Sequence, residues 1–171
     1  MINKTIIIAL ISILIFSCNT QTKQQEPLPQ INKEEVNIFM DNWHMAAAEA
    51  NFDAYFNAMD SDAVYVGTAA EEVWSKADFA SFSKPYFDKG KAWSFKAINR
   101  NVYFIENSNI IYFDELLDTW MGQCRGSGVL QLNSKNQWEI KHYVLSLVVP
   151  NEDIKAVVDL IEKGRVRNNK H

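Results

Sequence analysis

The last third of the chain alternates between apolar and polar residues with a period of two. The alternation runs through four consecutive segments, Val102–Glu106, Ile110–Thr119, Cys124–Leu132 and Trp138–Val149. Successive side chains of a strand point to opposite faces, so this pattern predicts antiparallel strands with one buried face. The sheet that these strands form is therefore the framework on which the rest of the fold is predicted.

The short connections between these segments set an expected register. The first turn pairs Arg100 with Glu115. A second turn at 121–122 pairs Glu115 with Gly128, and the third connection pairs Gly128 with His142. Together the pairings predict one polar row across four strands on the apolar face. Because strands lie roughly 4.8 Å apart, the backbones of Glu115 and His142 are expected about 10 Å apart, with only a glycine between them.

A polar row on an apolar face has two interpretations. Charged groups there must be paired or solvated, so the row indicates either a buried ion-pair network or a polar cavity. In a cavity, Glu115 and His142 are candidate catalytic residues for proton transfer. In a network, Arg100 and Glu115 form a static ion pair, and His142 is a satisfied core residue. For His44, beside the expected helix stripe, helix packing is favoured over entry into the cavity.

The first residues predict an exported protein with a lipid anchor. Lys4 precedes an apolar run, Ile6–Phe16, which is too short for the roughly 20 residues that a membrane-spanning helix needs. Ser17-Cys18 follows the run and resembles a bacterial lipobox, which makes Cys18 the expected lipidation site; an ordinary cleaved signal is the alternative. The expected location is the cell envelope, with a membrane-anchored lipoprotein facing the periplasm or the cell exterior.

Composition limits the domain count and the partners. We expect a signal peptide at 1–18, a flexible Gln- and Thr-rich tether at 19–32 and one domain at 33–171. The chain has 21 acidic and 17 basic residues, a net charge of −4, which argues against nucleic acid as a partner. Paired histidines at ligand spacing are missing, so no metal site is predicted, and no motif calls for a cofactor.

Helical periodicity precedes the strands. Apolar residues recur at helical spacing from Val36 to Ala47 and again from Phe52 to Met59. Ser75 and Asp78 form a capping box for a third helix, and a final amphipathic segment begins at Ile154. Helices followed by a run of antiparallel strands indicate an α+β fold in which helices cover one face of a curved sheet.

Element order and several motifs resemble a known family. The last strand carries Trp138-x-Ile140-x-His142-x-x-Leu145-Ser146. Further matching stretches are Trp43-His44, Gly67-Thr68, Trp74, the segment 84–95 and the segment 125–130. In these residues the chain resembles the SnoaL-like domains of the nuclear transport factor 2-like superfamily, and within them an exported bacterial lipoprotein branch. The resemblance covers about residues 34–151.

The resemblance implies a cone in which a curved antiparallel sheet wraps around N-terminal helices and a central pocket. We expect this pocket to bind a small, mostly apolar molecule. The candidate ligand-binding residues are Trp43, Tyr55, Trp74, Trp93, Arg100, Gly128 and Ser146. One alternative is an enzyme of isomerase, cyclase or dehydratase type that uses Glu115 and His142 for general acid–base chemistry. Another is a non-catalytic dimeric adaptor of the envelope.

The face of the sheet opposite the polar row is expected to be a dimer interface. In the predicted register it carries more apolar side chains than a solvated face should. These side chains are Tyr112, Leu116, Val129, Tyr143 and Leu145. Relatives of this kind commonly dimerise through the outer face of the sheet, so a homodimer is expected.

Overall fold

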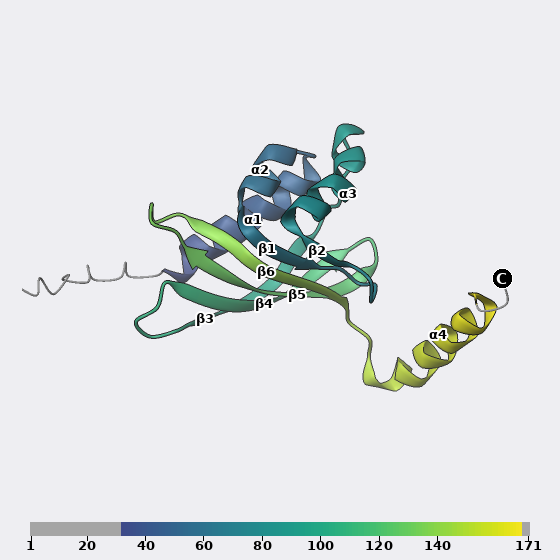
Figure 1. Cartoon of the computed structure of the whole chain (residues 1–171). Coiled ribbons are helices and arrows are strands. Elements are labelled where there is room, and N and C mark those ends of the chain that lie inside the picture. The colour runs from purple at the N-terminus through teal and green to yellow at the C-terminus, as the bar shows by residue number, and fades with distance from the viewer. Residues whose placement is uncertain (1–31, 169–171) are drawn as a thin grey trace, which may run out of the picture.

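The computed structural model describes residues 32–168, with side chains as far as Arg165. The predicted signal peptide, Cys18 and all of the tether before Asn32 lie outside these residues. The α+β class is confirmed, because helices α1, α2 and α3 lie together on one face of a curved six-stranded sheet (Figure 1).

The three helices begin where the sequence offers caps. They are α1 (Lys33–Ala48), α2 (Phe52–Asn57) and α3 (Lys76–Asp88). At the start of α3, the Ser75 hydroxyl accepts a hydrogen bond from the Asp78 amide at 3.2 Å and donates one to its carboxylate at 2.6 Å. Ser75 is therefore the N-cap, as predicted, and it satisfies one amide of the first helical turn. The return bond of Asp78 goes to the Ser75 hydroxyl instead of the Ser75 amide that a full capping box uses.

The sheet has the order β2-β1-β6-β5-β4-β3. β1 and β6 run parallel, and every other neighbouring pair is antiparallel. The strands are β1 (Met59–Val66), β2 (Val73–Ser75), β3 (Lys96–Phe104), β4 (Ile110–Thr119), β5 (Gly122–Leu132) and β6 (Trp138–Leu147). The inner face of the sheet packs on the apolar stripe of α1, where Val36, Met40 and Ala47 are fully buried.

The register agrees with the prediction at the first hairpin and differs at the second. Arg100 pairs with Glu115 as expected. Glu115 pairs with Gly126 instead of Gly128, because the two-residue turn between β4 and β5 is Trp120-Met121. A shift of two residues leaves every side chain of β5 on its predicted face but moves the glycine that faces Glu115.

A β-bulge in β6 reverses the predicted faces of its second half. Leu130 pairs with Ile140, as predicted, but Val129 pairs with His142, which leaves Lys141 as an extra residue in β6. After this bulge the inward residues are Tyr143 and Leu145, both buried. His142 is therefore on the outer face of the sheet. Its expected convergence with Glu115 is wrong.

The same bulge removes two residues from the predicted dimer interface. Tyr143 is fully buried and Leu145 is 5% exposed, so neither belongs to the outer face. The aromatic side chains that do lie there are Tyr103 and Tyr112, which stack with ring centroids 4.9 Å apart. Their exposed fractions are 40% and 49%, so this apolar area remains open to solvent.

Beyond β6 the chain leaves the sheet. A short 3-10 helix, η1 (Asn151–Asp153), leads into α4 (Ile154–Asn168). In Figure 1 α4 extends away from the sheet and from the other helices. Within residues 32–168, no helix has both the length and the apolar character needed to cross a membrane.

Candidate functional site

A buried carboxylate, Glu115, lies between α1 and the sheet and is fully paired. Its Oε1 atom accepts hydrogen bonds from His44 Nε2 at 2.8 Å and from the Tyr143 hydroxyl at 2.9 Å. Its Oε2 atom accepts a hydrogen bond from Arg100 Nε at 2.8 Å and forms an ion-pair contact with Arg100 Nη2, also at 2.8 Å. Glu115 is 0% exposed and His44 is 5% exposed. The polar row predicted from the sequence is thus a buried network. It is completed by His44 of α1 and by Tyr143, which takes the place expected for His142.

Arg100 links this network to α1 and to the surface. Its side chain is only 4% exposed, and its Nη1 atom donates to the Asn37 carbonyl oxygen at 3.1 Å. Its Nη2 atom also contacts the Asp41 carboxylate at 2.9 Å, where the side chain of Asp41 is 63% exposed. The guanidinium therefore joins β3, β4 and α1, because its three nitrogens point in different, fixed directions.

The electrostatics keep Glu115 ionised and Tyr143 protonated. Burial alone would raise the pKa of Glu115, but the hydrogen bond and charge of His44, the charge of Arg100 and the hydrogen bond from Tyr143 outweigh burial and lower the pKa overall. Burial and then the charge of Glu115 raise the pKa of Tyr143 well above its ordinary value. The tyrosine thus keeps the proton that it donates to the carboxylate.

Two glycines of β5 make room for this arrangement. A Cβ atom on Gly126 would lie 2.2 Å from the Tyr143 hydroxyl and 2.8 Å from Glu115 Oε1. One on Gly128 would lie 2.3 Å from the carbonyl oxygen of His142, beside the bulge. Glycine at 126 is therefore needed for the hydrogen bond between Tyr143 and Glu115, and glycine at 128 for the backbone of the bulge.

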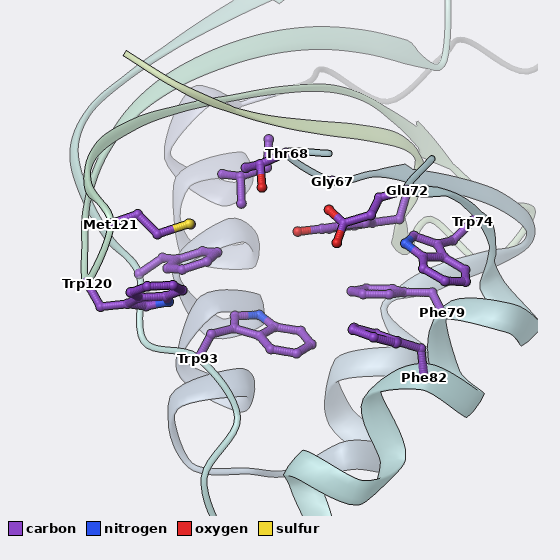
Figure 2. Close-up of a pocket in the computed structure, with 12 residues that line it drawn as sticks. Gly67, Thr68, Glu72, Trp74, Phe79, Phe82, Trp93, Trp120 and Met121 are labelled. Carbon is purple, nitrogen blue, oxygen red and sulfur yellow. The ribbon is translucent and has the colours of Figure 1, made fainter. Parts of the chain in front are cut away.

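A separate cavity of about 150 Å³ lies between α3, the β1–β2 hairpin and the β4–β5 turn. Six aromatic residues line it, and Trp120 of the turn adds a seventh ring. The six are Tyr65, Trp74, Phe79, Phe82, Trp93 and Phe95. Figure 2 shows Trp120 and Met121 on one side of the cavity and Trp74, Phe79 and Phe82 on the other, with Trp93 between them. The ring of Trp93 stacks on that of Phe79, with centroids 5.6 Å apart. We call this cavity the aromatic pocket.

The aromatic pocket has a buried floor and an exposed rim. Phe79 and Leu145 line its floor and are 3% and 5% exposed. Trp120 and Phe82 lie at its rim and are 81% and 43% exposed. Neither Glu115 nor His44 lines it, although Phe95 contacts the His44 ring edge-on at 6.3 Å between centroids. The pocket is therefore open to solvent but separated from the carboxylate network.

The predicted ligand-binding residues fall into two groups. Trp74 and Trp93 line the aromatic pocket. The other five do not line it and have structural positions: Trp43 and Tyr55 stack in the core at 4.7 Å, Arg100 pairs with Glu115, Gly128 accommodates the bulge, and Ser146 is exposed on β6. Within the described part of the chain, no three His, Cys, Asp or Glu side chains gather as metal ligands would.

Sequence reasoning missed His44 as a partner of Glu115, and it missed Glu72 in the aromatic pocket. His44 follows Trp43 on the buried stripe of α1, and its partner is 71 residues away, so no local pattern joins the two. Glu72 lies in the β1–β2 hairpin, which the sequence does not mark as a site. Tyr143 could have been found, because Tyr143 and Leu145 together are too apolar for the outer face on which they were placed.

Comparisons with known proteins agree on the fold. Residues 36–150 match the family model described as a SnoaL-like domain. A candidate ketosteroid isomerase from Parabacteroides distasonis ATCC 8503 is similar in structure, with a TM-score of 0.57 and 21% identity over 73% of this chain and 94% of that one. An NTF2-like protein from Cytophaga hutchinsonii ATCC 33406 has a TM-score of 0.57 and 12% identity over 69% of this chain and 100% of the other.

The third similar structure is an association domain. The association domain of C. elegans CaMKII has a TM-score of 0.55 and 18% identity over 67% of this chain and 95% of that domain. A search among curated proteins finds no match. At these identities the structural likeness shows the fold, on which many functions occur.

Proposed function

Because the chain belongs to the family of SnoaL-like domains, matched over residues 36–150, we propose that it binds a small, mostly apolar molecule in the aromatic pocket. The observation that carries the proposal is the pocket itself, whose walls are aromatic rings and whose rim is open to solvent. Concave, largely apolar sites with few polar groups are typical of small-molecule binding.

Binding is favoured over proton transfer because the buried acid–base groups are occupied. The three hydrogen bonds and the ion-pair contact of the Glu115 carboxylate all involve protein side chains, and the residue does not line the pocket. A general base must come within hydrogen-bond reach of the proton that it removes. His142, the second catalytic candidate, is on the other face of the sheet. The network therefore supports a role in stability, and the pocket supports a role in binding.

Titration with the neutral fluorophore phenylnaphthylamine tests the proposal. The dye should bind with rising fluorescence and quench the tryptophans of the pocket. Trp120→Ala should weaken binding roughly fivefold, since an aromatic contact contributes roughly 1 kcal/mol. This variant should fold normally, because Trp120 is 81% exposed.

Leu160→Ala provides the matched control. Leu160 is 67% exposed on α4 and does not line the pocket, so its loss should leave the dye affinity unchanged. If the wild-type protein does not bind the dye, or if Trp120→Ala binds it as tightly as the wild type, the proposed pocket function is wrong.

The membrane attachment is a further part of the proposed function. We propose that Cys18 carries a lipid and that the domain is tethered to an envelope membrane. Support comes from the sequence alone: an apolar run followed by Ser17-Cys18 and then a polar tether. Mass spectrometry of the protein from its native membrane should find a lipidated Cys18 at the N-terminus. An unmodified N-terminus at another residue would disprove the anchor.

The outer face of the sheet supports a proposal of self-association. The stacked pair Tyr103 and Tyr112 leaves an apolar area exposed there, and a homodimer through this face would bury it. Tyr112→Lys should then convert the dimer to a monomer in light scattering. Ile38→Lys is the control, because Ile38 is 52% exposed on α1, remote from the outer face. A wild-type protein that is monomeric at micromolar concentration contradicts this proposal.

A further inference from the structure

Among the residues that the structure describes, Glu72 is the one charged residue that lines the aromatic pocket. It lies in the hairpin between β1 and β2, and Figure 2 shows its carboxylate between Trp120 on one side of the cavity and Trp74 on the other. Within residues 32–168, no lysine or arginine lines the pocket. The pocket therefore presents a negative charge within aromatic walls.

The hairpin holds this carboxylate in place. Glu72 Oε2 accepts a hydrogen bond from the Ala69 amide at 3.1 Å, and the Glu72 carbonyl oxygen accepts one from the Gly67 amide at 2.8 Å. A Cβ atom on Gly67 would lie 2.2 Å from Glu72 Oε2, so a side chain at 67 would displace the carboxylate. The backbone of the β1–β2 hairpin therefore fixes the position of the Glu72 side chain.

The charge of Glu72 also affects the neighbouring phenol of Tyr65. Burial and then the charge of Glu72 raise the pKa of Tyr65, which keeps this phenol neutral. One oxygen of Glu72 remains bound to a single backbone amide, and a carboxylate can accept several hydrogen bonds or a close cation. The faces of Trp and Phe rings carry a partial negative charge, which attracts a cation and not an anion.

We propose that the aromatic pocket binds the alkylated ammonium group of a small organic cation. This proposal rests on the proposed binding function and names its ligand class. The ammonium lies between the rings of Trp93 and Trp120 and the carboxylate of Glu72, while its carbon substituents contact Phe79 and Leu145. Aromatic rings around a positive head group are the usual solution for quaternary ammonium recognition. The carboxylate adds charge selectivity that the rings alone lack.

A pair of isosteric probes tests the charge requirement. Choline and 3,3-dimethylbutan-1-ol, called dimethylbutanol below, have the same shape. The central atom is a positive nitrogen in choline and a neutral carbon in dimethylbutanol. In NMR titrations that follow the tryptophan indole signals, choline should bind at least about tenfold more tightly than dimethylbutanol. Glu72→Gln should abolish most of this preference by weakening choline binding, with dimethylbutanol affinity unchanged.

Glu71→Gln is the matched control for the change in net charge. Glu71 is exposed, adjoins Glu72 and does not line the pocket, so its replacement should leave the preference for choline intact. Equal affinities for choline and dimethylbutanol in the wild type would overturn the proposal. An equal loss of choline binding in Glu71→Gln and Glu72→Gln would also overturn it, since that result reflects general surface charge.

Phosphocholine distinguishes the source of the cation. Binding as tight as that of choline assigns a lipid head group, whereas loss of binding assigns a free alkylated amine; both results keep the ammonium site. The fluorophore separates this inference from the function on which it rests. If phenylnaphthylamine binds but choline shows no preference over its isostere, the pocket function stands and the ligand class is wrong. If no probe binds, both proposals fail.

Discussion

Replacing Glu115 by Gln should lower the free energy of unfolding by roughly 3–5 kcal/mol, as expected when one partner of a buried ion pair is removed. The substitution leaves the guanidinium of Arg100, whose side chain is 4% exposed, without its buried counter-charge. It also leaves His44 Nε2 and the Tyr143 hydroxyl facing a neutral amide. Urea denaturation of the two proteins at neutral pH measures the difference.

Asp41→Asn is the control for this prediction. Asp41 contacts the same guanidinium at the same kind of distance, 2.9 Å, but its side chain is 63% exposed. Exposed ion pairs contribute at most about 1 kcal/mol, so this variant should unfold almost like the wild type. Similar losses in both variants would show that the burial of Glu115 does not determine its contribution, contrary to our interpretation.

Glu115→Gln should also change how the free energy of unfolding depends on pH in acid. The pKa of Glu115 is lowered in the folded protein from its ordinary value of 4.5, so the unfolded chain takes up its proton first as the pH falls. The stabilisation by Glu115 is complete above pH 4.5 and declines as the pH falls through the lower folded pKa. Glu115→Gln should therefore flatten the acid side of the stability curve. An unchanged acid dependence would contradict the lowered pKa.

Gly126→Ala should be the second strongly destabilising change. The added Cβ would lie 2.2 Å from the Tyr143 hydroxyl and 2.8 Å from Glu115 Oε1, so the hydrogen bond between them must break or lengthen. Overpacking costs about 1–3 kcal/mol, and loss of a hydrogen bond to a charged group costs roughly 1.5–3 kcal/mol. We expect a loss of at least about 2.5 kcal/mol in thermal or urea unfolding.

A double-mutant cycle isolates the cause of that loss. In a Tyr143→Phe background the closest contact of the new Cβ is absent, so Gly126→Ala should cost at least about 1 kcal/mol less than it does in the wild type. Gly164→Ala serves as the control, because nothing lies within 4 Å of a Cβ on this helical glycine. Additive costs in the cycle would mean that Gly126 is needed for another reason.

Local patterns predicted most of the fold. Apolar spacing in α1, the helix cap at Ser75 and the alternation in β4 and β5 are properties of neighbouring residues, and the structure has all of them. The pairing of Arg100 with Glu115 followed from a single short turn and is also correct. These features need only local chain geometry and one adjacent strand.

The candidate site could not be predicted in full, because its partners come from distant elements. Strand alternation alone does not show where a bulge lies. Because of the bulge at Lys141, Tyr143 and not His142 is on the inner face. His44 reaches Glu115 only when α1 is packed across the sheet. The aromatic pocket combines α3, two hairpins and β6, whose relative positions depend on the whole core.

The extra residue at Lys141 also affects how β6 can be compared with other proteins. If a relative has a regular strand here, aligned residues point to the same face of the sheet in both proteins as far as Ile140. After Ile140, each residue of this chain points to the opposite face from the residue aligned with it. A histidine that faces inward in such a relative aligns with His142, although the side chain over Glu115 is that of Tyr143. Deletion of one residue, more than any substitution, would convert one arrangement into the other.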